Sequence, residues 1–190
     1  MIAYLITDPH YYTTHVVTFE RRLEAVLGRH RVTHACFRDK QSSNTEELAG
    51  VFVRVCQLFG VEQIYINTHM ALAQKLGATG VHLTSSQLAL IPDAKASRLQ
   101  VIASTHNSEE MTLAQKLGAD CVTYSPIFAT PHKGNPKGLE DLKDKVDKIR
   151  TNIIALGGIV TAEHVKSIEE TGAYGFASIR YFIDNAQYNR

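Results

Sequence analysis

Residues 113–124 read LAQKLGADCVTY, and the same seven letters LAQKLGA occupy positions 72–78, where GVHL follows at positions 80–83. In both copies a helical pattern runs into a glycine, and an alanine then leads into a short apolar segment. Glycine adopts the left-handed conformation at little steric cost, so each copy predicts a helix joined to a buried strand. A weaker third copy, EETGAYGFASI, covers positions 169–179. The repeat predicts helices that alternate with parallel strands.

Eight short apolar segments have the length and composition of buried parallel strands. They cover residues 2–7, 31–37, 63–67, 80–83, 100–104, 120–125, 153–157 and 175–179. Helical patterns include residues 19–27, 44–60, 108–117, 138–149, 161–171 and 181–187. The first helix is expected to stop at Gly28, and Asn44 with Glu47 predicts a capping box.

The alternation predicts an α/β fold, a (β/α)8 TIM barrel that forms a single domain over residues 1–190. An open doubly wound sheet would also alternate, but it would have about five or six strands and a clear switch point.

Composition and charge argue against several classes of partner. The net charge is +1 and the basic residues form no run, so no nucleic acid is expected as a partner. No apolar run approaches the ~20 residues of a membrane span, and the first residues lack a signal-peptide pattern. No membrane association is expected, and the expected location is cytoplasmic. Cys36, Cys56 and Cys121 lie far apart in apolar segments, which predicts reduced, buried thiols rather than metal ligands.

In a parallel barrel the functional site is built where the strands end, on the loops at their carboxyl ends. The polar residues expected there are Arg38, Lys40, Asn67, Thr68, His69, Ser85, Ser86, Gln87, Ser104, His106, Ser125, Thr130, His132, Lys133 and Ser178. Gly157 and Gly158 give the sharpest phosphate signal, because paired glycines between a strand and a helix let a phosphate reach backbone N–H groups. A tight turn is the alternative explanation for this pair.

The segment at 119–138, ADCVTYSPIFATPHKGNPKG, joins a strand to a long loop that carries Thr130, His132 and Lys133. This combination predicts an anion site with a titratable group beside it, and an ordinary surface loop is the alternative. Arg38 and Lys40 lie two positions apart at the end of one strand, so their side chains are expected to face the same side. They either form a second part of the anion site or belong to a strand end exposed to solvent.

Six motifs occur in one order along the chain. They are FRDK at 37–40, YIN at 65–67, GVHL at 80–83, AST at 103–105, SPIFATPHKG at 125–134 and ALGGI at 155–159. Together they resemble the thiamine phosphate synthase and TenI superfamily, over nearly the whole chain. The resemblance implies a (β/α)8 barrel that binds phosphorylated thiazole and pyrimidine precursors of thiamine, with a homodimer as an expected assembly.

The resemblance also implies roles for single residues. Positions that match the contacts of the pyrimidine diphosphate are Arg38, Lys40 and Asn67. Positions that match its other diphosphate contacts and the thiazole phosphate contacts are Ser104, Thr130 and Lys133. The thiazole phosphate cradle matches Gly158 with the backbone of Ser178 and Ile179.

Four positions depart from the family pattern. Thr68 and Gln87 stand where the synthases have acidic residues that hold Mg²⁺, and no nearby acidic residue replaces them. Cys36 replaces a glutamine, and Pro126 stands where the TenI tautomerase has a histidine.

The sequence therefore favours a TenI-like thiazole tautomerase that needs no cofactor and moves a proton on a phosphorylated thiazole. His132 is the expected acid–base residue with Lys133 beside it, and His69 and His106 are other candidates at strand ends. His82 lies inside a strand and is expected to be a core histidine with satisfied hydrogen bonds. The first alternative is a thiamine phosphate synthase, a transferase that would use Mg²⁺ and a pyrimidine diphosphate. The second is a barrel that binds its ligand without chemistry and serves regulation.

Overall fold

The computed structural model describes residues 1–40, 42–131 and 133–183. Its elements in chain order are β1 (Ile2–Ile6), α1 (Pro9–Tyr12), α2 (Val16–Arg29), β2 (His34–Phe37), α3 (Thr45–Leu58), β3 (Gln63–Asn67), α4 (Met70–Lys75), β4 (Gly80–Leu83), η1 (Ser85–Leu90), α5 (Ile91–Ala96), β5 (Gln100–Thr105), α6 (Ser108–Leu117), β6 (Cys121–Tyr124), α7 (Gly138–Lys148), β7 (Asn152–Leu156), α8 (Ala162–Glu169) and β8 (Gly175–Ser178).

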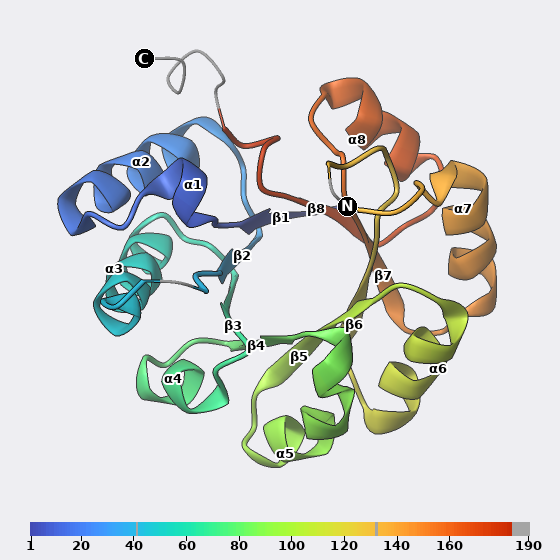
Figure 1. The fold of residues 1–190 in the computed structure, drawn as a ribbon, viewed down its shortest axis with the longest axis horizontal. Coiled ribbons are helices and arrows are strands. Elements are labelled where there is room, and N and C mark those ends of the chain that lie inside the picture. The colour runs from blue at the N-terminus through green and yellow to red at the C-terminus, as the bar shows by residue number, and fades with distance from the viewer. Residues whose placement is uncertain (41, 132, 184–190) are drawn as a thin grey trace.

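The eight strands pair in sequence order, all parallel, and β8 returns to pair with β1. The sheet is therefore a closed barrel, and the helices surround it as an outer ring (Figure 1). The (β/α)8 TIM barrel expected from the sequence is confirmed. No helix among the described residues is long and apolar enough to span a membrane.

The repeated LAQKLGA segments end their helices as the sequence predicts. Gly77, Gly118 and Gly172 all have positive φ angles, of 64°, 96° and 78°. In the two exact copies the next alanine donates its N–H to a carbonyl five residues back, so the chain leaves the helix and enters the following strand.

Two local expectations about helix ends are wrong. The helix predicted to stop at Gly28 continues to Arg29, because Gly28 has ordinary helical geometry. Asn44 precedes α3 but makes no side-chain capping bond there; its amide instead donates to the Thr14 carbonyl. The expected helix at 181–187 lies largely outside the described residues.

The sheet separates two buried clusters of side chains. The larger lies between strands and helices and includes Phe19, Leu48 and Phe52. The smaller fills the barrel interior, where Tyr4 and Tyr65 pack edge to face at 5.9 Å between ring centroids. Two tyrosines and smaller apolar side chains thus fill the interior, as in other (β/α)8 barrels.

Glycine at two strand starts lets neighbouring strands approach closely. A Cβ atom on Gly80 would lie 2.1 Å from the Gln100 carbonyl oxygen, and one on Gly175 would lie 2.0 Å from the Ile2 side chain.

We predict that Gly80→Ala lowers the free energy of unfolding by about 3 kcal/mol, because the backbone of β5 would have to move. Gly50→Ala on α3 is a matched control, since its Cβ would have only an ordinary contact at 3.9 Å. That control is expected to raise stability by up to about 1 kcal/mol through helix propensity. Urea denaturation followed by circular dichroism measures both, and an equally mild effect of the two changes would contradict the close-approach argument.

Candidate functional site

The carboxyl ends of the strands surround a cavity of about 430 Å³. All ten residues expected to bind substrate or phosphate line it: Arg38, Lys40, Asn67, Ser104, Thr130, Lys133, Gly157, Gly158, Ser178 and Ile179. The barrel thus brings together residues that lie as much as 141 positions apart, from Arg38 to Ile179. His132, the expected acid–base residue, lies outside the described residues.

The cavity lining is strongly cationic. Among the described residues that form it, Arg38, Lys40, Lys133 and Arg180 are basic, and none is an aspartate or a glutamate. A site with this charge attracts an anionic ligand, and the low dielectric of a cavity strengthens that attraction.

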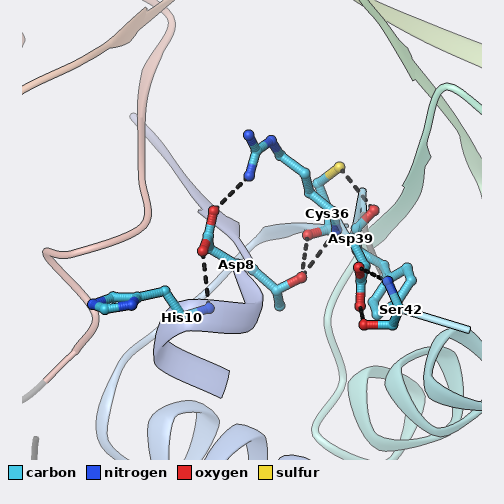
Figure 2. A network of polar contacts seen from close by, with 8 residues as sticks. Asp8, His10, Cys36, Asp39 and Ser42 are labelled. Atoms are coloured by element: carbon cyan, nitrogen blue, oxygen red, sulfur yellow. Dashed lines mark hydrogen bonds and ion pairs between the residues drawn. The ribbon is translucent and has the colours of Figure 1, made fainter. Parts of the chain in front are cut away.

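Arg38 lines this cavity with part of its guanidinium already paired, to the Asp8 carboxylate that Figure 2 labels beside His10. Its Nη1 atom lies 2.6 Å from Oδ2 of Asp8, whose other oxygen accepts the backbone N–H of His10 at the start of α1. The backbone N–H of Arg38 donates to the Thr7 hydroxyl, at 2.9 Å. The ends of β1 and β2 therefore hold Arg38 in place on both its backbone and its side chain.

The paired glycines have a structural reason to be glycine. Gly157 and Gly158 have φ angles of 99° and 71°. A Cβ atom on Gly157 would lie 2.8 Å from the Cα of Pro126, and one on Gly158 would lie 2.7 Å from the carbonyl carbon of Phe128. The pair thus lets the loop after β6 lie against the loop after β7, and both loops border the cavity.

Two hydroxyl groups of the expected phosphate cradle donate to the protein itself. The Ser178 hydroxyl donates to the Ile159 carbonyl at 2.7 Å, and the Thr130 hydroxyl donates to the Phe128 carbonyl at 3.0 Å. Among the described residues on this side of the cavity, backbone N–H groups and the cations of Lys133 and Arg180 remain as donors for an anion.

The two positions at which the resemblance implies metal ligands, Thr68 and Gln87, do not fit Mg²⁺. The Thr68 hydroxyl donates to the Asn67 carbonyl at 2.7 Å, and the Gln87 side-chain oxygen accepts from the backbone N–H of Thr84 at 3.2 Å. Neither side chain carries a charge, and Mg²⁺ in proteins is held through carboxylates. Within the described residues, no group of three or more His, Cys, Asp or Glu side chains is arranged to hold a metal ion.

His106 is the histidine at a strand end that borders the cavity, whereas His69 is not part of the lining. The His106 Nδ1 atom lies 3.2 Å from the Ser125 carbonyl oxygen. The same Nδ1 atom lies 3.3 Å from the Ser125 hydroxyl, so Ser125 contacts this nitrogen through both its carbonyl and its side chain. His106 is therefore the described candidate for an acid–base residue, and it contacts Ser125, which precedes Pro126 in the chain.

His82 is buried and hydrogen-bonded through both ring nitrogens, as expected of a core histidine, but it also borders the cavity. Burial, and next the charge of Arg38, lowers its pKa to about 4. Its side chain points inward from β4, because residues of a strand alternate between the two faces of the sheet. A count of strand positions at β4 could have placed it inside the barrel.

Arg180 is a lining residue that the sequence reasoning missed. It follows Ser178 by two positions, and the only signal for it was a basic residue just past the last strand. No ion pair joins Arg180, Lys40 or Lys133 to another residue in the described part of the chain.

The family model described as thiamine monophosphate synthase (TMP-TENI) matches residues 3–182. A thiamine-phosphate synthase of Syntrophomonas wolfei is 34% identical, over 93% of this chain and 85% of that protein. One of Salinibacter ruber is 36% identical over 60% of this chain, so the match spans about half (52%) of that relative. The solved thiamine phosphate pyrophosphorylase of Pyrococcus furiosus superposes with a TM-score of 0.79 at 26% identity, over 94% of this chain and 85% of that one.

We predict that Thr68→Asn raises the free energy of unfolding by about 1 kcal/mol. Thr68 has a φ angle of 64°, a conformation that is costly for a β-branched residue and tolerated by asparagine. Thr112→Asn on the exposed face of α6 is the control, with an expected change near zero. Chemical denaturation of both variants makes the comparison, and a destabilised Thr68→Asn protein would show that the hydroxyl contact of Thr68 outweighs the backbone cost.

Proposed function

The chain belongs to the thiamine monophosphate synthase (TMP-TENI) family, and from that premise we propose that it binds a phosphorylated thiazole and acts as a TenI-like thiazole tautomerase. The observation that carries the proposal is the charge of the cavity, which is lined by four cations and by no carboxylate in the described residues. Such a site suits an anion that binds directly to the protein rather than through a divalent cation.

The phosphate of the thiazole is assigned to the side of the cavity formed after β6, β7 and β8. Gly157 and Gly158 keep that backbone uncovered by side chains, and Lys133 and Arg180 supply charge. The ring then extends toward β5 and β6, where His106 and Ser125 border the same cavity. Lys133 follows His132 directly in the chain, so the expected acid–base residue belongs to the loop that also carries a phosphate-binding cation.

The proposed reaction takes a proton from one atom of the thiazole and returns a proton to another. One imidazole serves as base and then as acid, so the overall step needs neither a redox partner nor a leaving group. The chain's cations hold the phosphate throughout, and their charge favours the anionic intermediate that forms after the proton has left.

The second candidate is the synthase, because the similar proteins carry that name and because Arg38, Lys40, Asn67 and Ser104 all border the cavity. A synthase of this family would bring Mg²⁺ to neutralise the diphosphate leaving group. Thr68 and Gln87 do not fit that ion, which is why the tautomerase stands first.

One assay separates the activities: formation of thiamine phosphate from both precursors with Mg²⁺, against isomerisation of the carboxythiazole phosphate in the presence of EDTA. Binding of the thiazole phosphate without either reaction would favour the regulatory barrel.

We predict that binding of inorganic pyrophosphate, measured by calorimetry, is the same with Mg²⁺ and with EDTA. Thr68→Asp/Gln87→Asp restores two carboxylates and is expected to make Mg²⁺ tighten the binding by about tenfold. Gln57→Asp/Gln74→Asp adds the same charge on exposed helix faces and serves as the control. Strong Mg²⁺ dependence in the unchanged protein would refute the metal-free site.

We further predict that His132→Ala lowers the tautomerase rate by at least about 100-fold while phosphate affinity stays within about twofold, since loss of a general acid–base affects the chemical step. His106→Ala tests the described alternative, and His69→Ala, outside the cavity lining, is the control. Proton exchange on the substrate, followed by NMR, reports the rate. Full activity of His132→Ala together with an inactive His106→Ala would move the acid–base role to β5.

A further inference from the structure

A chain of hydrogen bonds runs from the barrel interior to the cavity. The Tyr4 hydroxyl on β1 lies 2.9 Å from Nδ1 of His82 on β4, and Nε2 of His82 lies 3.0 Å from the Ser104 hydroxyl on β5. Tyr4 is fully buried and His82 is 4% exposed, whereas Ser104 borders the cavity. The three strands thus connect a buried phenol to a group that can touch a ligand.

The middle member of this chain is a neutral imidazole at physiological pH. Its pKa is lowered to about 4, chiefly by burial and then by the charge of Arg38. A neutral imidazole has one N–H and one lone pair, so the proton on one nitrogen decides what the other nitrogen can do. The partner of Nδ1 therefore decides whether Ser104 receives a hydrogen bond from His82 or must give one.

The surroundings of Tyr4 favour one direction. The groups that interact with its hydroxyl are His82 Nδ1 and the thiol of Cys36, and that thiol has the Phe37 carbonyl as its own acceptor at 3.7 Å. An imidazole nitrogen accepts a hydrogen bond far better than a sulfur atom does. The stronger acceptor favours donation from Tyr4 to Nδ1, which places the proton of the ring on Nε2 and makes Nε2 a donor to the Ser104 oxygen.

Ser104 is then left with its own proton to donate. The cavity around it is cationic, and the influence of Arg38 on the His82 pKa shows that the guanidinium charge reaches this region. A ligand drawn there by Arg38 presents anionic oxygen atoms, which accept hydrogen bonds and cannot give them.

We propose that Tyr4 and His82 are positioning residues that make Ser104 an obligate hydrogen-bond donor to an anionic oxygen of the ligand. The buried Tyr4 on β1 thereby determines the direction of the hydrogen bond that Ser104 on β5 makes with the ligand. The proposal does not depend on whether the barrel is a tautomerase or a synthase, because either reaction needs an anion held in this cavity.

NMR of the protein labelled with ¹⁵N at histidine, with and without saturating inorganic pyrophosphate, tests the ring directly. The expected result is a neutral His82 whose Nε2 carries the proton in the pyrophosphate complex, with no protonation of the second nitrogen down to about pH 5. A proton on Nδ1 in the complex would overturn the proposal, and so would the absence of any pyrophosphate binding. Neither result bears on whether the barrel isomerises a thiazole, which is assayed separately.

A double-mutant cycle tests whether Tyr4 acts through Ser104. Ser104→Ala is expected to weaken pyrophosphate binding by about tenfold, and Tyr4→Phe by about fivefold. In the Ser104→Ala background, Tyr4→Phe should change the affinity by less than about twofold, because the group that it positions is gone.

Tyr65→Phe is the matched control for the cycle. Tyr65 is also a buried interior tyrosine, but its hydroxyl donates to Gln100 at the other end of the barrel and not to His82. It is expected to leave pyrophosphate affinity unchanged. An equal loss in Tyr65→Phe, or an undiminished effect of Tyr4→Phe without the serine hydroxyl, would overturn the proposal. If Tyr4→Phe does not fold, the NMR measurement on the unchanged protein decides alone.

Discussion

Closure of the sheet is the constraint on which the rest of the molecule depends. Pairing of β1 with β8, in a register that sets Ile2 opposite Gly175, turns a row of parallel strands into a ring. Because every strand runs the same way, all eight carboxyl ends open onto one cavity, and residues from Arg38 to Arg180 become neighbours there. The close approach of strands at Gly80 and Gly175 also supports closure of the sheet, since a side chain at either position would push two neighbouring strands apart.

The cavity that results is rich in cations and, among the described residues, free of carboxylates. Cations remain on both sides, whereas the positions that would hold a divalent ion carry Thr68 and Gln87, and both side chains are bonded within their own loops. The positive φ angle of Thr68 is a conformation that suits aspartate or asparagine better than threonine. The backbone at Thr68 therefore has a shape better suited to an aspartate or asparagine, while neither Thr68 nor Gln87 carries a charge.

The fold could be predicted from the sequence because helices and strands are specified by residues close together in the chain. The glycine after LAQKL ends a helix in both copies, where Gly77 and Gly118 each have a positive φ angle. The cavity residues followed from the rule that strand ends converge. What the sequence could not give are contacts between distant segments. The Asn44 amide reaches the Thr14 carbonyl instead of capping its own helix, and His82 meets Tyr4 across the barrel. Arg180 was missed because nothing local distinguishes it from a solvated arginine.

The ion pair between Asp8 and Arg38 has a consequence for selectivity. Part of the guanidinium is already paired with Asp8, so the charge of Arg38 is partly offset and only its remaining N–H groups are left for a ligand. Only a ligand whose oxygen atoms match the remaining N–H groups in direction gains from this residue. Arg38 thus adds selectivity for the geometry of an anion to the general attraction that the other lining cations, Lys40, Lys133 and Arg180, supply.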